Sequence, residues 1–171
     1  MPPTPETGPG GRAMCDHCGC RDLTPVRRLM DEHDRLRELS DVVRRALAAD
    51  DLPRAQTGFR MLLEVLGPHV AKEEKALFPR LAEVAELADH VAVLEGEHAD
   101  LFDAVDRLDD LAGGSGFAEQ WADGVQRALH ELDEHMFKED FGLFPAALAT
   151  LDGADWDAID AWEGAARVMP T

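Results

Sequence analysis

The chain has 171 residues, of which 45% are hydrophobic and 30% are charged, as in a single globular domain with a sizeable core. Its 17 Lys and Arg against 35 Asp and Glu give a formal net charge of −18, which argues against nucleic acid or an anionic membrane as a partner. The sequence has neither an apolar run of the roughly 20 residues that span a bilayer nor a signal peptide, so we expect a cytoplasmic protein.

The first half of the chain predicts a leader followed by two helices. We expect residues 1–21 to be a flexible leader with a cysteine-rich motif and residues 22–168 to form one domain. Thr24 and Pro25 are typical of a helix start, Thr as the N-cap and Pro at the first helical position, and apolar residues then recur at helical spacing to about residue 49. A second helix is expected to restart after Asp51. It contains Pro68, which predicts a kink just before His69.

The second half predicts two more long helices and a short closing one. Apolar residues at steps of three and four run over about 84–111 and again over about 117–149, separated by a Gly-rich loop at 113–116. A further helix is expected over 155–168. No segment alternates as a strand does. The sequence therefore predicts an all-α protein, an up-down-up-down four-helix bundle with a short C-terminal helix.

One stretch of the sequence is present in two nearly identical copies. Residues 69–79 and 135–145 both read H-x-x-K-E-[ED]-x-x-L-F-P, and an upstream Glu-His pair at 32–33 is echoed at 97–98. The offsets nearly agree, 98 − 33 = 65 against 135 − 69 = 66, so a unit of about that length is repeated. Each unit contributes one lone His and one His-x-x-x-Glu pair.

The repeated residues fall on the apolar faces of their helices. Four residues turn a helix by about 400°, so each His and the Glu that follows it lie one turn apart on the same face. Lys72 and Lys138 directly precede the two Glu residues and are expected to face elsewhere. Buried carboxylates cost several kcal/mol without a partner, and a metal ion would remove that cost. The predicted metal ligands are His33, His69, Glu73, His98, His135 and Glu139.

The other histidines and the Leu-Phe-Pro triplets receive different expectations. His130 lies away from the apolar face of its helix and is expected in solvent, whereas His90 flanks such a face and is expected at the rim of the site or as an outer partner. The two Leu-Phe-Pro triplets are expected to form apolar caps over the metal layer, each followed by a proline kink.

Mixed imidazole and carboxylate ligands suit iron, manganese or zinc, and six ligands shared by two ions favour a pair of irons. With this pattern the chain resembles the hemerythrin-like HHE cation-binding domain over about residues 22–168. The resemblance implies a four-helix bundle with two non-haem iron ions, bridged by Glu73 and Glu139 and by an oxo or hydroxo group.

The chain also departs from the pattern of the oxygen-carrying hemerythrins. Those proteins have His-x-x-x-His on the third helix, where this chain has Leu94 four residues before His98, and their fourth helix pairs His with an Asp one residue beyond the position of Glu139. The chain is more similar to the branch that includes iron–sulfur cluster repair proteins, although those carry an additional His. Fewer His ligands leave more open positions on the irons, which favours chemistry on O2, peroxide or NO over reversible oxygen carriage.

Three functions follow from the resemblance. The first is a di-iron protein that reacts with peroxide or O2, as a catalase- or peroxidase-like enzyme; the second is an O2 or NO sensor or iron carrier without turnover. The third is repair of iron–sulfur clusters after nitrosative damage, which would use the cysteine-rich motif. In that motif Cys15, His17, Cys18 and Cys20 could add a ligand or act as redox thiols, or could belong to a tail without a role.

Overall fold

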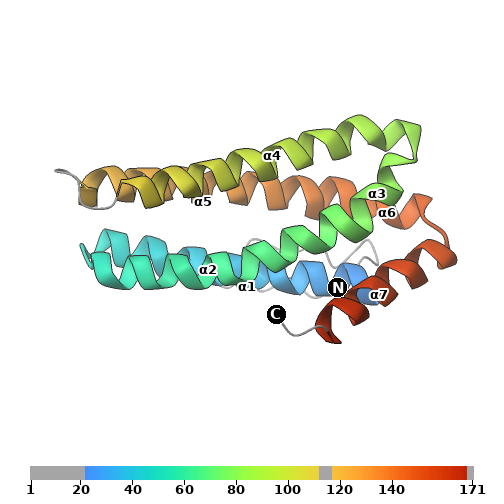
Figure 1. The fold of residues 1–171 in the computed structure, drawn as a ribbon, viewed down its shortest axis with the longest axis horizontal. Coiled ribbons are helices and arrows are strands. Elements are labelled where there is room, and N and C mark those ends of the chain that lie inside the picture. Colours follow the sequence, from blue (N-terminus) through green and yellow to red (C-terminus); the bar gives the residue numbers. More distant parts are fainter. Residues whose placement is uncertain (1–21, 112–116, 169–171) are drawn as a thin grey trace, which may run out of the picture.

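The computed structural model describes residues 22–111 and 117–168, and within these ranges it contains helices and no strand (Figure 1). The elements are α1 (Thr24–Ala48), α2 (Leu52–Lys72), η2 (Glu73–Leu77), α3 (Phe78–Ala82), α4 (Ala85–Asp110), α5 (Phe117–Lys138), η3 (Glu139–Leu143), α6 (Phe144–Thr150) and α7 (Gly153–Val168). α1 packs along α2, and α4 packs along α5, so consecutive long helices run side by side (Figure 1). The expected four-helix bundle is confirmed.

The helix starts differ in one detail from expectation. Leu23, not Thr24, is the N-cap of α1, because the carbonyl of Leu23 accepts the first helical bond from the amide of Arg27 at 2.9 Å. The Thr24 hydroxyl instead accepts a hydrogen bond from the Arg27 guanidinium at 3.3 Å. α2 begins as expected, since the Asp51 side chain accepts from the amide of Arg54 and caps the first turn.

A kink was expected at Pro68, and α2 runs through this residue as an α-helix to Lys72. The π-helical segment η2 follows α2 directly, and the π-helical segment η3 follows α5 in the same way. Both occupy the same place in the repeated sequence, and each is followed by Phe-Pro. A proline ring clashes with the carbonyl four residues before it, and the wider π turn relieves that clash. The two π segments begin at Glu73 and Glu139.

The apolar core is divided into two clusters by a layer of polar side chains. On α1, Leu29 belongs to one cluster and Leu36 to the other, and the buried His33 lies between them in the sequence. The same division occurs on α4 on either side of His98. Both α1 and α4 therefore pass from one apolar cluster to the other at a residue predicted to bind metal.

α7 closes the end of the bundle that holds the second cluster. Its Trp156 and Ile159 are buried in that cluster, and Asp155 and Asp160 accept ion pairs from Arg80 at 2.8 Å and Arg28 at 2.6 Å. The short C-terminal helix was expected to begin at residue 155, and it begins two residues earlier. No helix in the two described ranges has the length and apolarity needed to cross a membrane.

Candidate metal centre

The six predicted ligands converge between the two apolar clusters. Each is at most 5% exposed. They form two groups, and within each group the potential ligand atoms lie within 4.8 Å of one another. The first group is His33, His69, Glu73 and Glu139, and the second is Glu73, His98, His135 and Glu139.

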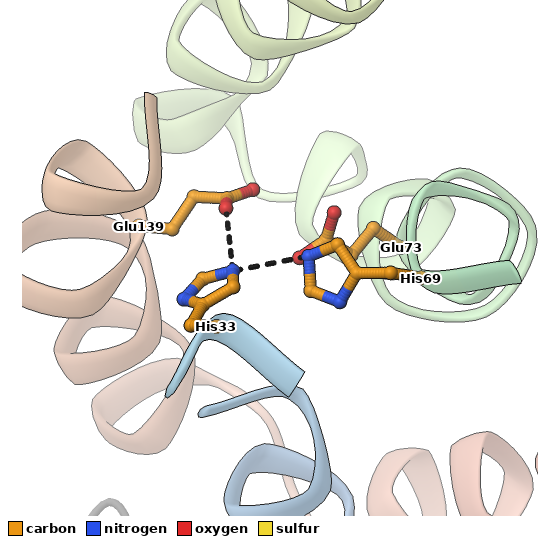
Figure 2. Close-up of side chains that lie close together, drawn as sticks. All are labelled: His33, His69, Glu73 and Glu139. Carbon is orange, nitrogen blue, oxygen red and sulfur yellow. Dashed lines mark hydrogen bonds and ion pairs between the residues drawn. The ribbon is translucent and has the colours of Figure 1, made fainter. Parts of the chain in front are cut away.

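The two glutamates belong to both groups because each directs one oxygen toward the first histidine pair and the other oxygen toward the second. Oε1 of Glu73 lies 3.3 Å from Nε2 of His69, and Oε2 lies 3.5 Å from Nε2 of His98. Glu139 repeats the arrangement, with Oε2 at 3.2 Å from Nε2 of His33 and Oε1 at 3.3 Å from Nε2 of His135. Figure 2 shows the first group, in which His33 from α1 faces Glu139 from η3 and His69 from α2. Each glutamate therefore lies between the two histidine pairs, with one oxygen on each side.

Six polar atoms at the centre are buried and have no hydrogen-bond partner among the described residues. They are both carboxylate oxygens of Glu73 and of Glu139, and Nε2 of His98 and of His135. Leaving one such atom buried without a partner costs about 1–3 kcal/mol, and more for a charged group. Six such atoms in one layer would strongly lower the stability of a small bundle. Cations between the groups would satisfy all six, so the donor set fits a pair of metal ions.

The opposite nitrogen of each imidazole faces a carboxylate, and we call these four acids the outer carboxylates. The pairs are His33 with Asp140 at 2.8 Å, His69 with Glu32 at 3.0 Å, His98 with Glu74 at 3.0 Å, and His135 with Glu97 at 2.9 Å. With Nδ1–H donating to a carboxylate, each ring turns the lone pair of Nε2 to the centre. Metal-binding histidines in proteins are usually held in this way.

A comparison with models of known protein families shows the family of this chain. The profile of the Hemerythrin HHE cation binding domain matches residues 24–147, which is more than half of the chain. The chain belongs to this family. No curated protein and no solved structure matches it in the corresponding searches. As a hemerythrin HHE domain with two His/Glu groups, the protein is a metal-cation-binding one.

The charge state of this hemerythrin domain without metal shows the conflict that metal would relieve. Burial, together with the charge of Glu139, raises the pKa of Glu73 well above its usual range. Burial also acts to raise the pKa of Glu139, but the neighbouring His135 and His33 outweigh it and hold that pKa well below normal. Two facing carboxylates cannot both ionise cheaply, so the pair keeps one proton to a higher pH than a free carboxyl group does.

The histidines of the first group divide in the same way. Burial works against a charge on His33, but its hydrogen bond to Asp140 and the negative charge of the nearby Glu139 prevail and raise its pKa to about 9. Burial lowers the pKa of His69 to about 4, although its bond to Glu32 acts in the opposite direction. Without metal, the two neighbouring rings therefore differ in charge at neutral pH, with His33 protonated and His69 neutral.

Two phenylalanines cover the centre, as the Leu-Phe-Pro triplets predicted. Phe144 stacks on His33 with ring centroids 5.6 Å apart and an interplanar angle of 21°. Phe78 stacks on His98 at 5.7 Å and 5°. Both phenylalanines are fully buried. They form an apolar lid over these two imidazoles on the side of the second cluster.

The sequence analysis missed the outer carboxylates, although the repeat contained their signal. A Glu precedes the lone His in both units, and an acidic residue follows the second Glu of both H-x-x-K-E-[ED] motifs. The residue one beyond Glu139, where the oxygen-carrying hemerythrins have their Asp, is also an Asp in this chain. This Asp140 is turned to Nδ1 of His33, while Glu139 faces the centre.

The remaining expectations concern residues around the site. Lys72 and Lys138 do face away from the centre, since they pair with Glu32 and Glu97. His130 is exposed as expected. His90 is half-buried and packs beside Gly142 in η3, outside both ligand groups. The cysteine-rich motif, with Cys15, His17, Cys18 and Cys20, lies outside the described residues.

Proposed function

We propose that the protein holds two iron ions in this centre and uses them to react with hydrogen peroxide or O2. The observation that carries the proposal is the pair of buried glutamates shared by two histidine pairs, Glu73 and Glu139. Each ion would have two imidazoles and two shared carboxylates. All four histidines and both glutamates would serve as ligands.

The ligand types favour iron. Imidazole with carboxylate is typical of non-haem iron sites that keep open positions, whereas structural zinc sites are closed and four-coordinate. Two carboxylates shared between two ions resemble the di-iron carboxylate centres built inside helix bundles.

The ligand count favours a reaction over simple storage. Four protein ligands leave open positions on a five- or six-coordinate ion. The residue one turn before His98 is Leu94, which is fully buried among apolar side chains and supplies no further ligand. When bound, iron would supply the electrons that reduce a small oxidant. The protein would position the ions, exclude bulk water with Phe78 and Phe144, and hold each imidazole through its outer carboxylate.

Disproportionation of peroxide is the form of the reaction that needs no partner protein, because two molecules of H2O2 give two of water and one of O2. The test is oxygen release after peroxide is added to the iron-loaded protein, followed with an oxygen electrode. We expect many turnovers for each protein, and loss of turnover in Glu73→Gln with Glu139→Gln. A single stoichiometric oxidation of the iron without sustained oxygen release would show a binding or sensing protein instead.

A further inference from the structure

The centre has two halves, one with His33 and His69 and the other with His98 and His135. The residues around the two halves correspond, except that one half lacks a basic side chain that the other has. Three of the four outer carboxylates form an ion pair with a basic side chain. The pairs are Glu32 with Lys72, Glu97 with Lys138, and Asp140 with Arg37. The fourth, Glu74, binds Nδ1 of His98 but has no ion pair with a lysine or arginine among the described residues. The repeat therefore breaks its symmetry at Glu74.

This loss of symmetry can be read from the sequence. His33 and His98 are equivalent, with an offset of 65, so the residue equivalent to Arg37 is 37 + 65 = 102, which is Phe102. Arg37 reaches from α1 to η3 and pairs with Asp140, and it also lies 3.4 Å from Asp34 on its own helix. Phe102 can form no such pair, and its side chain is 36% exposed.

Burial differs between the two halves in the same direction. The side chain of Asp140 is 5% exposed, beneath Arg37, whereas the side chain of Glu74 is 38% exposed. A carboxylate that is shielded from water and held by a charge-assisted bond keeps one orientation, and its bond to an imidazole is weakened less by solvent. His33 is therefore held more firmly than His98. The difference bears on metal affinity, because the groups behind a ligand typically change it 10- to 100-fold.

From this asymmetry we propose that Arg37 is a positioning residue that makes the two metal positions unequal. Through Asp140 it orients His33, so that a metal ion between His33 and His69 is bound more tightly than one between His98 and His135. The more weakly held position is then the one with the solvent-exposed outer carboxylate. This inference rests on the proposed two-metal centre and assigns an order of filling and retention to it.

In the unchanged protein a second ion would bind more weakly than the first simply because the two ions share both carboxylates. The two halves are therefore compared in two variants, each of which keeps only one half. His98→Ala leaves the His33–His69 half intact, and His33→Ala leaves the His98–His135 half intact. The probe is cobalt(II), which takes the same nitrogen and oxygen ligands as iron(II), titrated by calorimetry and by its visible absorption. We expect the His98→Ala protein to bind cobalt(II) at least about 10-fold more tightly than the His33→Ala protein.

Arg37→Leu then tests the cause. Added to His98→Ala, it is expected to weaken cobalt(II) binding about 10-fold, and added to His33→Ala it should change nothing. The matched control is Arg44→Leu. Arg44 also joins α1 to α5, through Asp133 at 2.7 Å and the carbonyl of Leu129 at 3.1 Å, but has no histidine behind it. A role limited to clamping the helices would make Arg44→Leu weaken the metal as much as Arg37→Leu.

The reciprocal change should work in the other half. Phe102→Arg, added to His33→Ala, offers Glu74 the missing cation and is expected to strengthen cobalt(II) binding several-fold. Should either single-half protein fail to fold, as judged by circular dichroism, Arg37→Leu in the otherwise unchanged chain replaces it. There the first of the two binding steps should weaken and the second should not.

The outcomes separate this inference from the function it rests on. Equal affinities in the two halves, or an unchanged affinity in Arg37→Leu, would overturn the asymmetry while leaving a two-metal centre in place. Stronger cobalt(II) binding in Arg37→Leu would overturn it as well. Absence of cobalt(II) and iron binding in the unchanged protein would instead refute the proposed metal centre itself.

Discussion

Nε2 of His33 lies 3.0 Å from Nε2 of His69, although Nδ1 of each ring already faces a carboxylate. If both Nδ1 atoms carry their proton, the two Nε2 lone pairs point at each other, and this arrangement is repulsive unless a cation lies between them. In the metal-free protein the cation is a proton, since the pKa of His33 is raised to about 9 and that of His69 is lowered to about 4. Metal and proton therefore compete for one place.

This competition predicts a pH dependence for the metal-free protein. A raised folded-state pKa stabilises the fold fully below the unfolded value, about 6.5 for His, and that contribution is lost as the pH rises through about 9 for His33. The raised pKa of Glu73 has the same sign. The lowered pKa of His69 acts oppositely, but its effect is complete above about pH 6.5. We expect the free energy of unfolding in urea to fall between pH 6.5 and 9, by on the order of 1–3 kcal/mol.

The control for this dependence is the metal-loaded protein. Bound metal replaces the proton, and metal affinity rises as the competing protons leave. Cobalt(II)-loaded protein should therefore gain stability relative to the metal-free form across the same pH range. A metal-free protein whose stability is flat or rises from pH 6.5 to 9 would contradict the assignment of that proton to His33.

Neutralising one bridging glutamate should stabilise the fold while weakening metal binding. Glu73 is fully buried, and its oxygens have no hydrogen-bond partner. Glu73→Gln removes a buried carboxylate that faces another, so we expect the metal-free protein to be more stable by about 1–3 kcal/mol at pH 8. Urea unfolding measures this. The control is Glu64→Gln, an exposed change on α2, the helix that leads into η2; it should alter stability by less than about 0.5 kcal/mol.

Much of this centre could be predicted from the sequence because the helical period and the repeat act together. Spacing by three and four placed His33 and His98 on inner faces, and the repeated motif did the same for the two His-x-x-x-Glu pairs. The fold class followed from the same periodicity.

The outer carboxylates could not be placed by that rule. Glu74 follows Glu73 directly and, in a regular α-helix, would point about 100° away from it. Glu74 binds Nδ1 of His98 on α4 while Glu73 faces the centre, and Glu32 on α1 likewise binds His69 on α2. Periodicity within one helix does not show which residue of another helix a side chain reaches. The π turns have a sequence signal only in retrospect, in the Leu-Phe-Pro triplets.

The phenylalanine lid should protect the metal from competing chelators. Phe144→Ala removes a fully buried ring stacked on His33, so we expect a loss of about 3–5 kcal/mol in stability. Water should enter the centre, and EDTA should extract the metal much faster. The measurement is the rate of cobalt(II) loss, followed by absorption, at a temperature where the variant stays folded. Phe141→Ala, at a residue that is 46% exposed, should leave that rate almost unchanged.

The outer carboxylates should set metal affinity without touching the metal. Glu32 accepts from Nδ1 of His69 and pairs with Lys72. Glu32→Gln removes the charge that holds this ring, and we expect cobalt(II) affinity to fall by about 10- to 100-fold. Titration by calorimetry measures the change. Glu38→Gln lies on the same helix, in an exposed pair with Arg35, and should bind cobalt(II) as the unchanged protein does. Equal affinities in the two variants would mean that Glu32 has no role in holding the ligand.

The central claim is that Glu73 and Glu139 bridge two metal ions inside one bundle. Its most direct test is elemental analysis of iron in the purified protein, loaded anaerobically with iron(II) and freed of excess, beside Glu73→Gln with Glu139→Gln prepared identically. We predict close to two irons for each unchanged chain and almost none in the double variant. One iron or none in the unchanged chain, or an iron content that the two substitutions leave unaltered, would contradict the account.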